Sequence, residues 1–450
     1  MPRLLVIGGM AAGMSAASKL RRLRPEWEAT VLEAGPDRSY GACGLPYLAG
    51  GEVRDASDLY ALGEDEIAAR GIEVRLRQRV TALQEGRKRV EVEELGSGRR
   101  RPEAYDALLV ATGARAALPS LRGLSGENLF TLHDLGDGRR LQKFLEVEHP
   151  RSALVWGSGY IGLEAVENLA RRGLSVTLIN RSVRVLRDLC PHLREKVVLE
   201  LEARGVRLLL ETDVGEVLSS GNRIASLETD RGSLAADLFL VATGVRPDTD
   251  FLRGSPLPMA ANGALAVDET CATGIHGVWA AGDCCEVTHL VSGRPTYIPL
   301  GTTANKMGRV AGANIAGERE RFPGVVGTAV TRVFSLEAGV TGLSAPAAEA
   351  AGFSVETATV DGWSRAGYYP GGGPVAISLV SDRRGRLLGG HVVGAEGTKG
   401  RVDTLAAALT AGLRVEDLVH MDLAYAPPFA PVWDPLLVAA SALRNKLRGR

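Results

Sequence analysis

The chain repeats one pattern of apolar and polar positions twice. Each copy opens with a run of apolar residues, at Leu4–Ile7 and at Ala153–Trp156, and each run ends in a glycine-rich turn. A stretch of helical character follows, and then a second strand-like run, at Ala29–Glu33 and at Ser175–Ile179. Strand, glycine turn, helix and strand is the order of a βαβ unit, so we predict two units with parallel sheets.

Each unit is closed by a further apolar strand. Ala107–Gly113 and Leu238–Gly244 both finish in Ala-Thr-Gly, and a third such strand, Gly277–Ala281, runs into Gly282 and Asp283. Small residues at a strand end allow a ligand to approach the backbone closely. We therefore expect the ends of these strands to face bound cofactors.

The pattern changes after about Pro323. Alternating apolar positions predict strands at Ala329–Phe334, Val375–Val380 and Leu387–Val393, followed by a helix over about Val402–Ala411. Strands that pair before a helix covers them are typical of an α+β domain. We predict that this C-terminal part forms a domain of its own.

Composition narrows the class of protein. Hydrophobic residues make up 45% of the chain, charged residues 24%, and the formal net charge is zero. Bulk charge therefore gives no reason to expect nucleic acid or a membrane surface as partner, and no apolar run reaches the length of a membrane span. The first residues read as a buried strand and not as a secretory signal.

The five cysteines have no CxxC or Cys/His metal spacing. An odd number in a chain without an export signal favours reduced thiols, a cytoplasmic location and no metal site. The adjacent pair Cys284 and Cys285 offers a metal or redox pair as one interpretation. Two small buried residues after a Gly-Asp turn are the favoured one.

The first glycine turn departs from the usual G-x-G-x-x-G pattern. Gly8 and Gly13 hold the outer positions, but Met10 stands at the second glycine, and Gly9 supplies the missing room one residue earlier. Such a turn brings pyrophosphate close to the backbone at a helix N-terminus. Glu33 follows at the end of the next strand, where a carboxylate binds ribose hydroxyls and excludes a 2′-phosphate.

The second glycine turn matches the pattern fully at Gly157, Gly159 and Gly162. The position equivalent to Glu33 holds Asn180, followed by Arg181. No carboxylate repels a 2′-phosphate there, and the arginine can pair with one. The sequence admits both NADH and NADPH.

Cys43 stands between two turn glycines after the first βαβ unit. Five residues further on is Leu48, so the chain lacks the C-x4-C pair that stores electrons as an internal disulfide. A single thiolate either forms a mixed disulfide with a small thiol or is oxidised to a sulfenic acid. The alternative for Cys43 is a small buried hydrophobic residue.

Taken together, these motifs resemble those of the pyridine nucleotide-disulfide oxidoreductases. The resemblance rests on the doubled glycine turns, Cys43 in Cys-Gly-Leu-Pro-Tyr, the segment Ala242–Pro247 and Ala281–Asp283, and it extends over essentially the whole chain. Within the single-cysteine branch the chain is most similar to coenzyme A-disulfide reductases. The resemblance implies an enzyme that passes hydride from NAD(P)H to FAD and electrons from the flavin to Cys43.

The resemblance also implies the fold and the assembly. It predicts an α/β protein with two Rossmann-like domains, one for FAD and one for NAD(P)H, and a C-terminal α+β dimerisation domain. The FAD domain is expected at 1–115 and 247–322, the NAD(P)H domain at 116–246 and the dimerisation domain at 323–450. A homodimer follows from the last of these.

The cofactor contacts that the resemblance implies gather at the turns and strand ends. Asp283 is similar to the residue that binds the ribityl chain of FAD, Tyr160 to the aromatic that covers the nicotinamide pocket, and Glu164 to a carboxylate beside the nicotinamide. The full expected set is Gly8, Gly9, Ala11, Ala12, Gly13, Glu33, Ala34, Val80, Ala111, Thr112, Gly113, Asp283, Pro299, Leu300, Gly301, Thr302 and Thr303 for FAD, and Gly157, Ser158, Gly159, Tyr160, Ile161, Gly162, Glu164, Asn180, Arg181, Thr243 and Gly244 for NAD(P)H.

The substrate contacts that the resemblance implies come from several parts of the chain. Lys19 and Arg22 share a helix face and suit the phosphates of coenzyme A, although such clusters are also ordinary solvated faces. Ser39 and Tyr368 are further expected contacts, while core packing in the third domain is favoured for at least one of Tyr368 and its neighbour Tyr369. Tyr425 is expected either to reach the partner's active site or to pack at the subunit contact.

Three alternatives stay open. The first is an NAD(P)H oxidase or peroxidase working through a Cys43 sulfenic acid, although the turn at Met10 lacks the histidine of the peroxide-using relatives. The second is a polysulfide or persulfide reductase. The third, of another class, is a flavoprotein redox sensor. Ala42, where some relatives have Asn before the cysteine, removes a hydrogen bond whose effect the sequence leaves open.

Overall fold

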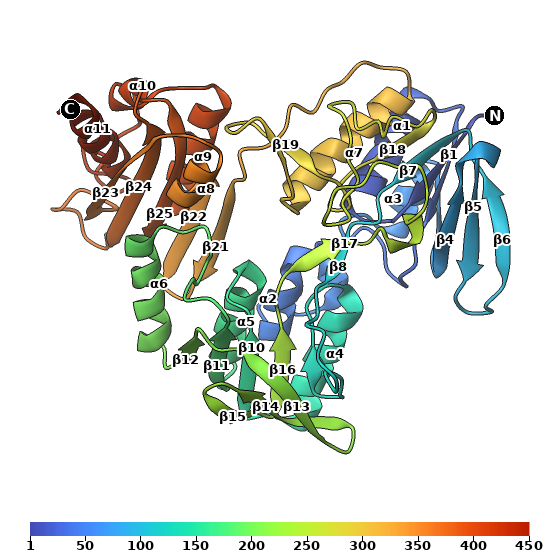
Figure 1. Ribbon diagram of the computed structural model, residues 1–450, viewed down its shortest axis with the longest axis horizontal. Helices are drawn as coiled ribbons and strands as arrows, with labels where there is room; N and C mark the ends of the chain where they lie inside the picture. Colours follow the sequence, from blue (N-terminus) through green and yellow to red (C-terminus); the bar gives the residue numbers. More distant parts are fainter. Residues whose placement is uncertain (450) are drawn as a thin grey trace.

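The computed structural model describes residues 1–449 and has three lobes (Figure 1). The first lobe, blue and yellow, is built on a five-stranded parallel sheet. Its strands lie in the order β18 (Val278–Ala280), β7 (Ala107–Val110), β1 (Arg3–Ile7), β2 (Glu28–Leu32) and β3 (Ile72–Arg75). The first lobe thus draws on segments far apart in the sequence, and the predicted parallel pairing of its βαβ unit is confirmed.

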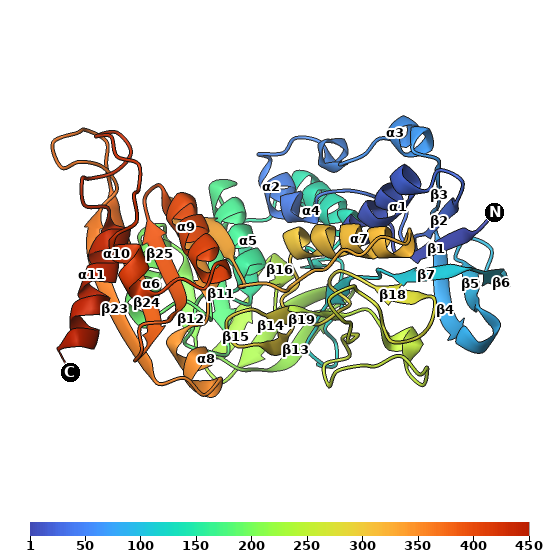
Figure 2. The ribbon, with the colours of Figure 1, turned by 90° about the horizontal axis from the view of Figure 1, so that it is seen from above.

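Two helices pack side by side over this sheet (Figure 2). Helix α1 (Ala11–Leu23) follows the first glycine turn, and α7 (Gly301–Ile315) comes almost 300 residues later. A β-carbon at Gly308 of α7 would overlap the backbone of Ala12 in α1. The close approach of the two helices therefore depends on glycine, and it joins the two sequence segments of the lobe.

The second lobe repeats the plan. Its parallel sheet has the order β12 (Arg207–Leu210), β11 (Ser175–Asn180), β10 (Ser152–Trp156), β16 (Leu238–Val241) and β9 (Leu129–Phe130). The parallel pairing predicted from the second repeat is confirmed. The helices of this part of the chain are α4 (Leu135–Glu148), α5 (Tyr160–Arg171) and α6 (Pro191–Ala203).

The third lobe is an antiparallel sheet covered by helices. Its strands lie in the order β21 (Ala329–Val333), β22 (Leu336–Gly342), β25 (Leu387–Gly394), β24 (Pro374–Asp382) and β23 (Val355–Trp363). This confirms the predicted α+β character. Its helices are α8 (Ala345–Ala350), α9 (Thr398–Thr410), α10 (Val415–Val419) and α11 (Pro435–Arg448). Helix α9 begins four residues earlier than predicted from the sequence, because the Thr398 amide donates to the Glu337 carboxylate at 2.9 Å.

Smaller elements join these lobes. Two antiparallel ribbons extend the first two: β4 (Gln78–Gln84), β5 (Arg89–Glu94) and β6 (Arg100–Ala104), and β13 (Val214–Ser220), β14 (Arg223–Thr229) and β15 (Gly232–Ala235). Short pieces complete the fold: α2 (Leu45–Gly50), α3 (Glu64–Ala69), β8 (Ala114–Ala116), β17 (Val245–Pro247), β19 (Val287–His289) and β20 (Arg294–Thr296). Among residues 1–449 no helix combines the length and apolar character needed to cross a bilayer.

Candidate active site

A long cavity runs along the carboxyl ends of the first sheet. Its volume is about 1220 Å³, above the ~300–1,000 Å³ usual for a small-molecule site. Its wall includes the first glycine turn, the strand end at Ala111 and Thr112, and Asp283 after β18. The cavity also reaches Cys43. An extended dinucleotide fits this shape better than a compact ligand does.

The first glycine turn leaves the backbone bare where a phosphate would lie. Gly8 has φ +106°, and a β-carbon on it would overlap the Ala111 carbonyl. A β-carbon on Gly13 would overlap the Gly8 carbonyl. Glycine is required at both places, and α1 then starts with its free N–H groups towards the cavity. Gly8, Ala11 and Ala12 line the cavity, with Met10 between them.

Glu33 closes the far end of the turn. Its carboxylate accepts from the Gly9 amide and from the Gly35 amide, each at 2.7 Å. Burial raises the pKa of Glu33, while these two bonds oppose the rise. Both Glu33 and Ala34 line the cavity. A fixed, half-buried carboxylate at this strand end suits ribose hydroxyls.

Asp283 lies on the cavity wall where β18 ends. Burial raises its pKa to about 6, and His133 and the Leu300 amide oppose the rise. Gly301 and Thr302, at the start of α7, line the same cavity. Asp283 is half-buried and has no ion pair among residues 1–449, so donors from a ligand would stabilise its carboxylate. The residues present therefore fit FAD.

Several residues that were predicted to bind FAD do not line the cavity. Gly9 and Gly13 belong to the glycine turn but do not line the cavity. Val80 packs in the core of the first lobe, whereas its neighbour Arg79 lines the cavity. Ala111, Thr112 and Gly113 line it as predicted. The positions that lie outside the lining are Gly9, Gly13, Val80, Pro299, Leu300 and Thr303.

The second glycine turn has the same build. β-Carbons on Gly157 and Gly162 would overlap the carbonyls of Ala242 and Gly157, whereas one on Gly159 would meet nothing within 4 Å. The chain is therefore open to a ligand at Gly159. Thr243, at the end of β16, donates from its hydroxyl to the Ala117 carbonyl at 2.5 Å, and Gly244 follows with φ +111°. These residues fit the pyrophosphate of a nicotinamide dinucleotide.

Tyr160, Ile161 and Glu164 lie on the first turns of α5, after this glycine turn. Burial raises the pKa of Tyr160, and the charges of Asp188 and Glu164 add to the rise. Ile161 is exposed. Glu164 is half-buried, and its environment raises its pKa as well, chiefly through burial.

Cys43 is the exposed cysteine of the chain. It lies in a short 3-10 turn (Ala42–Gly44) that leads into α2. Burial of the sulfur raises the pKa of the Cys43 thiol, and the charges of Glu164 and Asp283 raise it further. Carboxylates from both nucleotide lobes therefore act on this one sulfur. These carboxylates disfavour the negatively charged thiolate of Cys43. They favour its uncharged forms, which are the protonated thiol and the mixed disulfide.

The other cysteines have ordinary packing roles. Cys284 and Cys285 are 0% and 3% exposed, which confirms the favoured interpretation of a buried pair. Cys271 is buried beside them, and Cys190 precedes α6 in the second lobe. Among residues 1–449 no group of His, Cys, Asp and Glu has the arrangement of a metal site.

A polar network that sequence reasoning missed joins β21 of the third lobe to α5 and to the segment after α2, which packs against the core of the second lobe. Arg332 of β21 donates to Glu167 of α5 at 2.7 Å and to Glu52, just after α2, at 2.5 Å. Its guanidinium also lies over the Tyr47 ring, 5.6 Å from the centroid. The next residue back, Thr331, donates to Glu164 at 3.0 Å. No local motif predicts such a junction, because its members are up to 280 residues apart.

The predicted substrate residues fall into two groups. Ser39 is buried on the cavity wall, and Arg22 lines its rim. Lys19 does not line the cavity, and its ammonium group lies 2.8 Å from the Glu320 carboxylate. Arg309, on α7, is an exposed lining residue that the sequence analysis did not single out.

Tyr368 and Tyr425 meet far from this cavity, in the third lobe. Their hydroxyls are 3.0 Å apart, and the two side chains are 76% and 44% exposed. The expectation that Tyr368 or Tyr369 packs in the core is wrong, since Tyr369 is also 37% exposed. Tyr368 and Tyr369 lie in the loop between β23 and β24. Phe429 and Trp433, further along the chain after Tyr425, are exposed as well.

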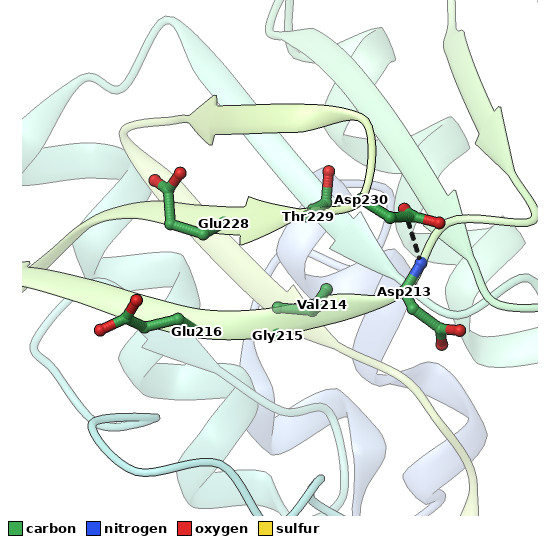
Figure 3. Close-up of a pocket in the computed structure, with 7 residues that line it drawn as sticks. All are labelled: Asp213, Val214, Gly215, Glu216, Glu228, Thr229 and Asp230. Atoms are coloured by element: carbon green, nitrogen blue, oxygen red, sulfur yellow. Dashed lines mark hydrogen bonds between the residues drawn. The ribbon is translucent and has the colours of Figure 1, made fainter.

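A second hollow lies on the ribbon of the second lobe (Figure 3). Asp213, Glu216, Glu228 and Asp230 surround it, and the Asp213 amide donates to Asp230 at 3.1 Å. It is shallow, acidic and built on exposed strand ends. It contains none of the predicted site residues.

Comparison with known proteins identifies the class. Residues 2–308 match the pyridine nucleotide-disulphide oxidoreductase family, and residues 328–435 match its dimerisation domain. The chain therefore belongs to this family of FAD- and NAD(P)H-dependent oxidoreductases, as the sequence motifs predicted. The predicted fold class and cofactors are confirmed with it.

The relatives differ in the activity that their names give. The chain is 37% identical to the NAD(P)H coenzyme A polysulfide/persulfide reductase of Pyrococcus horikoshii, over 98% of each chain. It is 29% identical to the coenzyme A disulfide reductase of Staphylococcus haemolyticus, over 96% of each. Among solved structures, the water-forming NADH oxidase from Lactobacillus brevis and its engineered NADPH oxidase variant each match at 27% identity with a TM-score of 0.95. These two matches cover 100% and 99% of this chain and 99% of each solved chain.

Proposed function

We propose that this protein reduces coenzyme A disulfide, or a closely related coenzyme A-linked sulfur compound, through a mixed disulfide on Cys43. The observation that carries the proposal is the position of Cys43: it is exposed on the wall of the dinucleotide cavity, with no second cysteine near enough to pair with it. Two relatives act on coenzyme A-linked substrates by name. Both observations favour an exchange between Cys43 and a small thiol.

The bound flavin supplies the redox step, taking a hydride from the nicotinamide and passing two electrons to sulfur. On this proposal two electrons and one proton cleave the Cys43 mixed disulfide to the Cys43 thiolate and a free thiol. The thiolate then attacks a new disulfide, which restores the mixed disulfide and releases the second thiol as a thiolate. Asp283 and Glu33 are the residues proposed to hold the flavin nucleotide.

The coenzyme A phosphates are proposed to lie along α1 and α7. Arg22 and Arg309 line the cavity rim, both are exposed, and neither has an ion pair with any residue from 1 to 449. Lys19 is a weaker candidate than the sequence analysis implied, because Glu320 already neutralises it. A second copy of the chain is proposed to bring Tyr425 and Tyr368 to the site through the dimerisation domain.

The second candidate function is reduction of a coenzyme A persulfide or polysulfide. The relative with 37% identity carries that name, and an exposed Cys43 serves it equally well. Oxygen or peroxide reduction through a sulfenic acid is less supported, because the first glycine turn contains Met10 and no histidine. The histidine that lines the cavity, His133, comes from the segment before α4.

Anaerobic turnover with coenzyme A disulfide, coenzyme A persulfide, glutathione disulfide and peroxide tests the proposal. Coenzyme A disulfide is expected to give the highest kcat/KM, and Cys43→Ser to abolish its reduction. If the persulfide is faster by tenfold or more, the second candidate replaces the first. Peroxide turnover above that of every disulfide contradicts both.

The nicotinamide choice is a separate question. The name of the engineered NADPH oxidase gives an Asp-Ala-Met run exchanged for Ala-Arg-Ser, and a further arginine introduced five positions after that serine. This chain has Asn180-Arg181-Ser182 where β11 ends, and Arg187 five positions after Ser182. The spacing supports use of NADPH here.

A further inference from the structure

Helix α2 begins two residues after Cys43, yet its apolar side chains belong to the core of the second lobe. Leu45 and Leu48 are fully buried there and pack with residues of α4 and α5. The approach to α4 is close, since a β-carbon on Gly138 would lie 2.8 Å from a Leu45 methyl group. Figure 1 shows α2, in blue, beside α4 and α5 in the lower lobe. The helix that follows Cys43 is therefore anchored in the second lobe, although the surrounding sequence builds the first.

Polar contacts tie the chain on both sides of Cys43 to the second lobe as well. Before the cysteine, the buried Asp37 carboxylate accepts hydrogen bonds of 2.9 and 3.0 Å from Arg139 of α4. After the cysteine, the Glu52 carboxylate lies 2.6 Å from the guanidinium group of Arg171, the last residue of α5. Cys43 thus stands between two charged anchors on helices of the second lobe.

Gly50, at the end of α2, lies directly against Asn168 of α5. A β-carbon on Gly50 would stand 1.9 Å from the Asn168 Oδ1 atom, so the contact requires glycine. Asn168 is 1% exposed, and its Nδ2 atom donates to the Glu164 carbonyl at 2.8 Å. Its Oδ1 atom has no hydrogen-bond partner among residues 1–449. Because an unpaired buried oxygen is costly, stability alone would favour an apolar residue here.

We propose that Cys43 is held by the second lobe, and that Asn168, through its contact with Gly50, is a positioning residue that sets the separation of the Cys43 sulfur from Glu164. Glu164 lies four residues before Asn168 on α5, and its charge acts on the sulfur. A displacement of α2 from α5 therefore changes the chemistry of Cys43 and not only the stability of the fold. Since this lobe is also the one proposed to bind the nicotinamide nucleotide, its movement relative to the first lobe carries the sulfur with it.

Gly50→Ala tests the contact through the pH profile of Cys43 alkylation in the reduced holoenzyme. The charged groups that act on the sulfur are Glu164 of α5 and Asp283 after β18. The added β-carbon forces α2 away from α5, so the effect of Glu164 should weaken and the profile should shift to lower pH by roughly 0.3–0.5 unit. Gly63→Ala is the matched control, since a β-carbon there would meet nothing within 4 Å. In a Glu164→Gln background, Gly50→Ala should give no further shift. A purely structural contact would lower the free energy of unfolding and leave the profile unchanged.

Native-state hydrogen exchange of the wild-type holoenzyme tests the anchoring of α2 without any variant. The amides of α2 should open in the same urea-dependent step as those of α4 and α5, and separately from those of α1 and α7. The proposal is overturned if α2 opens together with α1 and α7, if Gly50→Ala keeps the wild-type alkylation profile, or if it shifts the profile equally in the Glu164→Gln background. Neither measurement uses a disulfide substrate, so these outcomes are independent of the proposed function, which fails only on turnover.

Discussion

The Thr331 hydroxyl donates a hydrogen bond of 3.0 Å to the Glu164 carboxylate. This bond joins the first strand of the C-terminal lobe to the helix that follows the second glycine turn. The Glu164 charge in turn raises the pKa of Cys43. A side chain of the dimerisation domain thus fixes a carboxylate whose charge acts on the Cys43 sulfur.

Glu164→Gln should make Cys43 more reactive at lower pH. The carboxylate disfavours the thiolate, and a neutral amide does not, so the Cys43 pKa should fall. The rate of alkylation of the reduced protein rises with pH through that pKa, and its profile should shift to lower pH. Cys43→Ser shows that the label reports this thiol. As a control, Glu52→Gln removes a carboxylate that pairs with Arg332 and should leave the pH profile of alkylation unchanged. If Glu164→Gln and the wild type have equal profiles, the Glu164 charge does not act on Cys43.

Arg332→Met should weaken the junction between the third lobe and helices α2 and α5. The change leaves the Glu167 carboxylate, which is 1% exposed, with fewer donors. We expect the free energy of unfolding in urea to fall by roughly 1–3 kcal/mol, since a half-exposed arginine is partly screened by solvent. Arg253→Met breaks an exposed pair with Asp250 and should cost under about 0.5 kcal/mol. If the two variants lose the same free energy of unfolding, the Arg332 network contributes no more to stability than an ordinary exposed ion pair.

Asp283→Asn should have opposite effects on stability and on flavin binding. Burial raises the folded-state pKa of Asp283 from 3.8 to about 6. Stability from the protonated form is fully present below pH 3.8 and is lost as pH rises through 6. The flavin-free variant should therefore be more stable than flavin-free wild type above pH 6, by up to roughly 2–3 kcal/mol.

The same variant should bind FAD more weakly, because a carboxylate accepts stronger hydrogen bonds than an amide does. Thermal melts of the flavin-free proteins between pH 4 and pH 8, and a titration with FAD at pH 7.5, measure the two effects. A variant that is less stable at every pH would show that Asp283 has a packing role only.

Arg22→Ala should raise KM for coenzyme A disulfide far more than it lowers kcat, because phosphate contacts are equal in ground and transition states. Arg309→Ala should act in the same way. Lys19→Ala should have a smaller effect, because Glu320 neutralises the lysine. Glutathione disulfide lacks the phosphates and serves as the control substrate. A rise in KM for both substrates would assign the arginines to folding and not to coenzyme A.

Features that depend on a few neighbouring residues could be predicted from the sequence. Glycine turns, strand ends and the position of Glu33 follow from spacing along a few residues, and the two parallel sheets and the buried Cys284 appear as predicted. The network of Arg332 and the pairing of Lys19 with Glu320 were out of reach. Both depend on which distant segments the fold brings together. In the sequence alone, each of these charged residues is indistinguishable from an ordinary solvated side chain.

The exposure of Tyr368 and Tyr369 in the third lobe could not be predicted from the sequence either. An aromatic pair beside alternating strands predicts core packing, yet Tyr368 and Tyr369 follow β23 in an exposed loop. Their exposure is a property of loop geometry, which apolar periodicity does not report. Cys43 illustrates the converse, since its position between two glycines and its motif singled it out, and the residue lines the cavity.

The central claim is that Cys43 carries one small thiol between turnovers. Intact mass of the unreduced holoenzyme, measured before and after incubation with coenzyme A disulfide and followed by peptide mapping, tests it directly. We predict one coenzyme A moiety in disulfide linkage at Cys43, removed by one equivalent of NADPH under anaerobic conditions and absent from Cys43→Ser. Unmodified Cys43 throughout, or only oxygen added to its sulfur, would contradict the claim and favour the sulfenic acid route.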